Sequence, residues 1–178
     1  MANAEFKAWE KIPRDNPFTV TISEKMDGTN ACVIIQEGVI IGVQSRKRLI
    51  TQEDDNYGFA AWVFENETDL LSLGDGYHYG EWAGIGIQKN PHALDSKKFF
   101  LFNTFRWNEN NPNRPKCCEV VKVLFQGELK PETIPNLLEV LKEGAGEGET
   151  PEGVVAYYHA FRKYTKHTIK SPNGKWHK

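Results

Sequence analysis

A lysine with possible chemistry of its own lies in the segment Glu24-Lys25-Met26-Asp27-Gly28-Thr29-Asn30. An amine attacks phosphorus only when it is unprotonated, and burial or neighbouring cations favour that form. Gly28 has no Cβ, so backbone and a phosphate can approach each other closely there. Lys25 is therefore the candidate nucleophile of a phosphorus-transfer reaction. Without further context, the same residues equally describe a strand, a turn and a solvated lysine.

The residues before Lys25 predict a β-strand. In the run from Phe18 to Ser23, apolar and hydroxyl side chains alternate, which is the period of a half-buried strand. Lys25 is therefore expected at a strand end.

The spacing Lys-x-Asp-Gly resembles the nucleophile motif of the covalent nucleotidyltransferases, which include polynucleotide ligases and messenger-RNA capping enzymes. The extension with Thr29 and Asn30 is most similar to that of the RNA ligases. This resemblance implies that Lys25, Asp27 and Gly28 lie in a nucleotide pocket. It also implies that Glu24 contacts the base and that Asn30 orients the phosphate.

Further segments resemble the motifs of that superfamily in the same order along the chain. Ser45-Arg46 is similar to the motif whose arginine contacts the nucleotide and the incoming phosphate, a task that suits the donor fork of a guanidinium. Lys47 or Arg48 could serve instead. A basic hairpin end that faces solvent is the alternative interpretation.

Two aromatic segments resemble the parts that hold the nucleoside. In Tyr79-Gly80-Glu81-Trp82 the resemblance gives Glu81 the role of accepting hydrogen bonds from the ribose hydroxyls. In the segment 98–103 it gives Phe102 the role of stacking on the purine, next to Asn103, where aspartate is usual. Phe100 shares a face with Phe102, so both can line the pocket, although such rings more often form core.

A carboxylate for a metal is expected at Glu152. Four Glu-Gly pairs occur in the chain, but only Glu152-Gly153 follows the aromatic segments and directly precedes an apolar run. The resemblance implies that this carboxylate helps to hold Mg²⁺ or Mn²⁺, ions that join one or two carboxylates to substrate phosphates.

The segment from Tyr164 to Lys170 is the best match to the last motif of the superfamily, a pair of lysines that reach the α-phosphate. The resemblance gives this role to Lys166 and Lys170, although their spacing departs from the usual Lys-x-Lys. Cations that converge on one phosphorus stabilise developing negative charge.

Taken together, the resemblance implies an ATP-dependent RNA ligase. Lys25 would take AMP from ATP, pass it to a 5′-phosphate end, and allow a 3′-hydroxyl to displace it. A DNA nick ligase, a capping guanylyltransferase that uses GTP, and a nucleic-acid end-binding domain without turnover are the alternatives. Only 24 residues precede Lys25, which favours ATP over a nicotinamide cofactor.

The chain of 178 residues is long enough for one well-buried core, so we expect one domain over residues 1–178. The order of the predicted elements favours an antiparallel-rich α+β nucleotidyltransferase fold with two packed sheets, similar to an ATP-grasp fold. Only eight residues follow Lys170, so no OB fold is expected, and nucleic acid would be held by this domain or by another chain.

Several elements are expected around these motifs. The patterns predict a hairpin over 31–43, a helix over 57–73 and a helix that begins at Pro131 and stops at Gly144. Further strands are predicted over 77–82, 98–107, 119–125, 154–158 and 164–170.

Charge and cysteine content restrict the class further. The net charge of −2 argues against binding through overall basicity, yet no acidic residue follows Val154. That basic end is either a phosphate-facing surface or a solvated tail. Cys32, Cys117 and Cys118 have neither disulfide nor zinc spacing, which favours a reducing compartment. A cytoplasmic protein, in the host cytoplasm if a phage encodes it, is expected, because no apolar signal or membrane-length run occurs.

Overall fold

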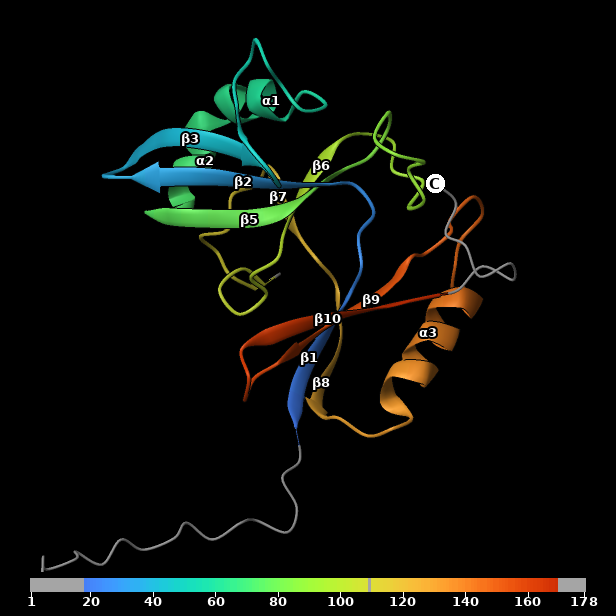
Figure 1. Ribbon diagram of the computed structural model, residues 1–178. Helices are drawn as coiled ribbons and strands as arrows, with labels where there is room; N and C mark the ends of the chain where they lie inside the picture. Colours follow the sequence, from blue (N-terminus) through green and yellow to red (C-terminus); the bar gives the residue numbers. More distant parts are fainter. Residues whose placement is uncertain (1–17, 109, 170–178) are drawn as a thin grey trace, which may run out of the picture.

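The structure, a computed structural model, describes residues 18–108 and 110–169 and contains two antiparallel-rich sheets (Figure 1). The first sheet has the strand order β10-β9-β1-β8, and the second has the order β4-β3-β2-β5-β6-β7. The strands of the first sheet are β1 (Thr19–Glu24), β8 (Val123–Glu128), β9 (Gly153–Tyr158) and β10 (Lys163–Thr168). Those of the second are β2 (Thr29–Gln36), β3 (Val39–Ser45), β4 (Leu49–Ile50), β5 (Gly76–Ala83), β6 (Lys98–Leu101) and β7 (Cys118–Val120). The expected α+β class with two sheets is confirmed, and neither sheet of the described residues forms an OB barrel.

The first sheet buries one face against a helix and leaves the other toward the second sheet. Val20 and Ile22 on β1 are fully buried beside α3 (Thr133–Glu143), whose apolar side chains pack on the same cluster. The alternation that predicted the strand and the spacing that predicted the helix are both confirmed. Because side chains alternate along a strand, Thr21 and Ser23 face the opposite side and line a cavity between the sheets.

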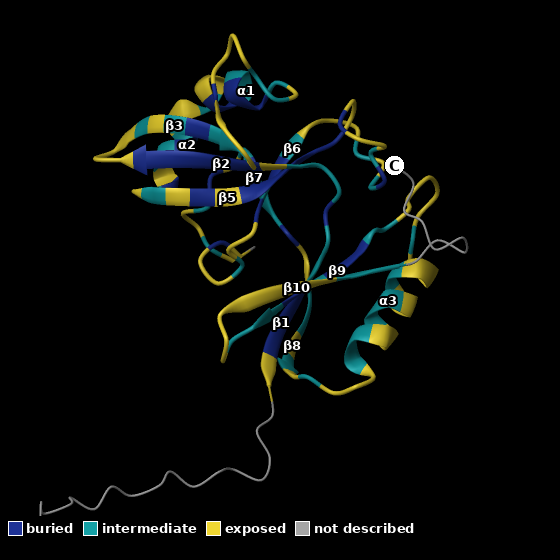
Figure 2. Cartoon of the chain, in the orientation of Figure 1, coloured by how far each residue is buried: buried dark blue, intermediate teal, exposed yellow. Residues whose placement is uncertain are grey.

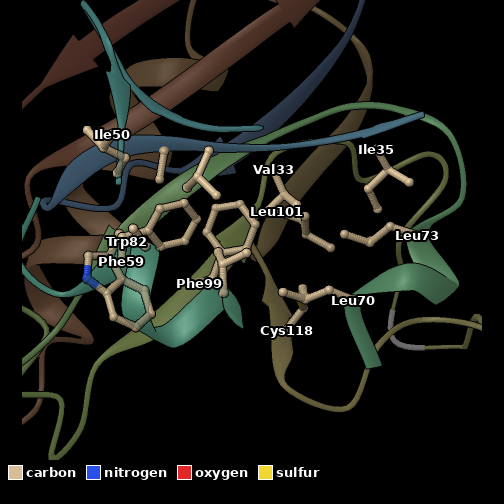
Figure 3. Close-up of a cluster of buried hydrophobic side chains, with 14 of the residues drawn as sticks. Val33, Ile35, Ile50, Phe59, Leu70, Leu73, Trp82, Phe99, Leu101 and Cys118 are labelled. Atoms are coloured by element: carbon tan, nitrogen blue, oxygen red, sulfur yellow. The ribbon is translucent and has the colours of Figure 1, made fainter. Parts of the chain in front are cut away.

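The second sheet packs its outer face on α1 (Phe59–Glu65) and α2 (Glu67–Leu70), followed by the 3₁₀ turn η1 (Leu71–Leu73) (Figure 3). Phe59, Trp82 and Phe99 meet at the centre of this core, with Phe59 and Phe99 ring centroids 5.0 Å apart. The β2–β3 hairpin confirms the expected one. Because the helices cover only the outer face of the second sheet, its inner face can carry polar residues, as the inner face of the first sheet does.

The single helix predicted over 57–73 was wrong, because the helix is interrupted at Asn66. The Asn66 side chain donates to the Trp62 carbonyl at 2.8 Å, and its backbone leaves the helical region with φ −113°. Asparagine side chains compete in this way with the helical hydrogen bonds of the backbone. The interruption turns α2 so that Leu70 also enters the core.

Two predicted strands were also wrong in extent. The strand expected over 98–107 ends at Leu101, because the Asn103 side chain accepts from the Arg106 amide at 3.1 Å and folds the chain into a turn. The strand expected over 119–125 is two strands, β7 and β8, which belong to different sheets. The chain crosses between the sheets at Val121 and Lys122.

The described helices are short, and none of them combines the length and apolar character that crossing a membrane requires. Figure 2 shows that buried residues concentrate in the central strands, whereas α3 keeps an exposed outer side.

Truncation of Phe99 tests the packing of the second sheet. Phe99 is fully buried among Phe59, Trp62 and Trp82, so Phe99→Ala should lower the free energy of unfolding by about 3–5 kcal/mol. Phe64→Ala on α1, where the side chain is 46% exposed, should cost under about 1 kcal/mol. Urea unfolding followed by tryptophan fluorescence measures both. Equal losses for the two variants would contradict this core.

Candidate active site

A cavity of about 1300 Å³ lies between the inner faces of the two sheets. Its wall combines Thr21 and Ser23 of the first sheet with residues of β2, β3 and β5 of the second. The segment from Glu24 to Ala31, which carries the candidate nucleophile, crosses from one sheet to the other along this cavity. The cavity is therefore built at the place where the two sheets are connected.

Lys25 stands directly after β1, as the sequence predicted. Its amide donates to the Gly153 carbonyl at 2.9 Å, which fixes the end of β1 beside the start of β9. Its amine forms an ion pair with the Glu152 carboxylate, and the two side chains are only 21% and 15% exposed. A half-buried amine needs such a partner, since removing a charge from water is costly. The pair holds the amine at the cavity wall.

Glycine is required at position 28 because the backbone there lies directly against β5. A Cβ at this position would lie 2.4 Å from the Trp82 carbonyl oxygen and 2.9 Å from the Ala83 side chain. A Cβ essentially never lies this close to such atoms, so any other residue would push the loop that follows Lys25 away from β5. The glycine of the motif therefore also serves the packing of the loop.

Glu81 is the most deeply buried carboxyl of the cavity, at 8% exposure. It is paired with Asn30 across β2 and β5, and the Asn30 amide donates to its Oε2 at 2.9 Å. Burial raises the pKa of Glu81 to about 7, although the positive charge of Lys25 acts against this shift. A carboxyl group is thus held at a defined place in the cavity that Lys25 also lines.

His92 is a site residue that the sequence analysis did not select. Its Nε2 accepts from the Asp27 amide at 3.2 Å, and its Nδ1 lies 3.5 Å from Glu24 Oε1. A long hydrogen bond from His92 lowers the pKa of Glu24, against the opposing effect of burial. His92 thereby contacts residues on both sides of Lys25. It comes from a loop 65 residues beyond Asp27, and no spacing in the sequence signals this contact.

Of the three basic residues at the end of the β2–β3 hairpin, Arg46, Lys47 and Arg48, only Arg46 belongs to the described cavity wall. Arg46 lines the cavity, whereas the Arg48 guanidinium binds the Asp54 carboxylate at 2.6 Å outside it. Lys47 is exposed and is absent from the described cavity wall. This placement favours Arg46 among the three alternatives.

The other expected residues are placed as follows. Phe102 and Lys166 line the cavity, together with Glu24, Asp27, Gly28 and Asn30, while Glu152 reaches it through its contact with Lys25. Phe100, which was expected beside Phe102, is not part of the described cavity wall and packs with Met26, Ala83 and Val121. Lys170 lies outside the described residues.

The carboxylates around the cavity do not form a closed metal cage. Among residues 18–108 and 110–169, no group of three or more His, Cys, Asp or Glu side chains is close enough to hold an ion. Glu152 and Glu81 instead stand as separate oxygen donors beside an open space. This donor set fits a divalent ion such as Mg²⁺, which usually keeps waters and takes its other ligands from substrate phosphates.

These features define a nucleotidyltransferase fold, in which two antiparallel-rich sheets enclose a cavity with a lysine at a strand end. The family model described as "RNA ligase" matches residues 18–171, and the chain therefore belongs to the RNA ligase family.

Solved structures of similar fold come from Naegleria gruberi RNA ligase. A variant with ATP and Mn has a TM-score of 0.64 and 19% identity, and the match covers 85% of this chain and 50% of that one. A variant with AMP and Mn and the ligase with PPi each have a TM-score of 0.61, at the same identity and coverage. The chain thus spans about half the length of these structures. No curated protein is similar enough in sequence to match.

The raised pKa of Glu81 predicts a pH-dependent stability. The unfolded carboxyl ionises near 4.5 and the folded one near 7, so stability should fall as pH rises between these values and then level off. Glu81→Gln removes this loss and should gain on the order of 3 kcal/mol over the parent at pH 8. Urea unfolding of both proteins at several pH values measures the difference. Glu143→Gln, at an exposed position on α3, is the control, and a pH-independent gain from Glu81→Gln would contradict the burial of this carboxyl.

Proposed function

We propose that the chain is an ATP-dependent RNA ligase whose residues 1–178 act as one nucleotidyltransferase domain. The observation that carries this proposal is the Lys25 amine at the end of β1, paired with Glu152 and facing a cavity that also holds Glu81 and Arg46. Membership of the RNA ligase family supports the reaction class. The similar Naegleria gruberi structures contain ATP or AMP with Mn, which supports the same ligands here.

The first step forms a bond between Lys25 Nζ and the α-phosphorus of ATP. Before this attack Lys25 passes one ammonium proton to the Glu152 carboxylate that contacts Nζ, which leaves the neutral amine as the attacking group. As the new bond forms, the bond from the α-phosphorus to the pyrophosphate oxygen breaks, pyrophosphate leaves, and the nitrogen gives up a second proton to solvent. AMP then remains on Lys25 through a phosphorus–nitrogen bond.

Two further transfers complete the reaction. An oxygen of the RNA 5′-phosphate attacks the phosphorus of the lysyl-AMP, and the phosphorus–nitrogen bond breaks. A 3′-hydroxyl then attacks the 5′-phosphorus, releases AMP and leaves a phosphodiester. In each step the protein mainly positions the reactants and neutralises phosphate charge.

The candidate site residues have the following proposed tasks. Glu81 accepts from the ribose hydroxyls, and Phe102 stacks on the adenine. Arg46, Lys166 and Lys170 bind phosphate oxygens, and Asn30 orients the phosphate. Glu24, held by His92, lies beside the base, and Asp27 and Gly28 shape the loop around the phosphate. Glu152 would hold the divalent ion, which neutralises charge on the phosphate oxygens when it is bound.

The proposed location is the cytoplasm. All three cysteines are free, and the Cys117 and Cys118 sulfurs lie 4.0 Å apart without forming a disulfide. Unpaired thiols are typical of reducing compartments.

Covalent labelling tests the proposed function directly. Incubation with α-labelled ATP and Mg²⁺ should leave label on the parent protein, and Lys25→Ala should retain none, since the AMP is proposed to be carried on the Lys25 amine. Lys47→Ala, at an exposed position outside the cavity wall, should label like the parent. Gel electrophoresis under denaturing conditions reads the result. Labelling from GTP instead would indicate a capping-type enzyme, and no label from ATP, GTP or dATP would indicate a binding domain.

A matched pair of arginine variants tests the phosphate contact. Arg46→Ala should slow formation of the labelled adduct by about 10- to 100-fold, because a charge-assisted hydrogen bond to phosphate is lost. Arg48→Ala should stay within about twofold of the parent, since Arg48 pairs with the exposed Asp54. Initial rates of labelling at saturating Mg²⁺ measure both. A larger effect of Arg48→Ala would reverse the assignment.

A further inference from the structure

An aromatic surface on the cavity wall has no task in the adenylyl-transfer chemistry. It consists of Phe105, Tyr157, His159 and Tyr164, which we call the aromatic patch, and all four line the cavity. The Tyr157 and Tyr164 ring centroids lie 4.7 Å apart, and the Phe105 and His159 centroids lie 5.2 Å apart. Residues from two strands and a loop are thus brought into one continuous set of rings.

The patch is both exposed and held in place. Tyr164 and Phe105 are 64% and 56% exposed, and each packs on Tyr157. The His159 ring is fixed by a hydrogen bond of 2.9 Å with Thr21 Oγ1 on β1. Figure 2 shows β10 exposed along much of its length. Ring faces are therefore available to a partner without rearrangement of the sheet.

The charge around the patch suits a polyanion. The β9–β10 hairpin from Gly153 to Thr168 has no acidic residue, and it carries Arg162, Lys163 and Lys166. None of these three cations forms a salt bridge with a described residue. Lys166 and Tyr164 are two residues apart on β10 and both line the cavity. Interleaved cations and open aromatic faces are the features of surfaces that bind single-stranded nucleic acid.

The position of the patch relates it to the nucleophile. Tyr157 on β9 is opposite Thr21 on β1. Thr21 lies four residues before Lys25 in the chain. At the rise of a β-strand this places Tyr157 about 13 Å from Lys25 along the inner face of the first sheet. A strand whose end reaches Lys25 can therefore cross the patch with the nucleotides next to that end.

We propose that the aromatic patch binds unpaired nucleotides of the RNA strand whose end reaches Lys25. The inference rests on the proposed function and adds the substrate class, a single-stranded end. Bases inside a nicked duplex stack on each other and present no free face to Tyr164 or Phe105. Stacking on these rings is independent of sequence, because every base has a π-face. Arg162 and Lys163, beside Tyr164 at the turn of the hairpin, supply positive charge for the phosphates of the bound strand.

Binding to matched oligonucleotides tests this inference. A labelled, 5′-phosphorylated single-stranded RNA is titrated without ATP, and fluorescence anisotropy gives the dissociation constant. Tyr164→Ala and Phe105→Ala should each weaken binding by about 5- to 100-fold, as expected for the loss of one stacked base. The affinity for a nicked duplex of the same sequence should change by less than about twofold.

Two control variants separate stacking from other effects. Tyr164→Phe keeps the ring and should bind like the parent. Phe161→Ala removes a ring that is 56% exposed on the same hairpin but packs on Phe18, away from the described cavity wall, and should also bind like the parent. Unchanged affinity of Tyr164→Ala and Phe105→Ala would overturn the proposal. Equal losses for single-stranded RNA and nicked duplex, or an equal loss for Tyr164→Phe, would do the same.

A parallel measurement distinguishes this proposal from the proposed function. If the parent retains no label from ATP but its RNA binding depends on Tyr164, the ligase assignment fails and the patch remains a nucleic-acid site. If the parent is labelled but substitutions in the aromatic patch leave its RNA affinity unchanged, only this inference fails. The remaining alternative is that the patch joins two copies of the chain. Analytical ultracentrifugation of the parent and of Tyr164→Ala measures their oligomeric states and tests it. A dimer that Tyr164→Ala dissociates would make the patch a protein interface and overturn the proposal.

Discussion

The ion pair between Lys25 and Glu152 joins side chains that are 127 positions apart in the chain, and the geometry of the cavity depends on it. It is possible because the Lys25 amide binds the Gly153 carbonyl, so the end of β1 and the start of β9 are held together. A half-buried charge without a partner would cost several kcal/mol. The pairing of β1 with β9 and the placement of the amine are therefore one constraint.

Each sheet packs on helices with its outer face and lines the cavity with its inner face, which explains why the cavity is polar. Each sheet buries its outer face, the first against α3 and the second against α1 and α2 (Figures 1 and 3). The inner faces carry the complementary set of alternating residues, which includes Glu81, Asn30 and Thr21. Because the two hydrophobic cores are built on the outer faces, the inner faces are free to carry the charged and aromatic side chains that line the cavity. Stability and ligand binding thus use opposite sides of the same strands.

The deviations from the predicted elements have local causes with consequences for the site. Asn66 interrupts a helix, and Asn103 ends a strand, in both cases through a side chain that competes for backbone hydrogen bonds. The turn at Asn103 places Phe105 beside His159 rather than along an extended β6. The crossing at Val121 and Lys122 passes the chain from β7 to β8, and the Lys122 carbonyl accepts from the Glu24 amide at 2.9 Å. Irregular segments therefore contribute as much to the site as the strands do.

The sequence by itself determined the strand before Lys25, the helix α3 and membership of the RNA ligase family. These features are encoded by neighbours a few residues apart, so periodicity and spacing reveal them. Only the tertiary structure decided that His92 holds Glu24 and the Asp27 amide and that Arg46 and not Arg48 faces the cavity. It also decided that Phe102 lines the described cavity wall whereas Phe100 packs with Met26, Ala83 and Val121. Each of these depends on strand register and on contacts between distant segments. Such contacts follow from the packing of the whole chain, and no local pattern specifies them.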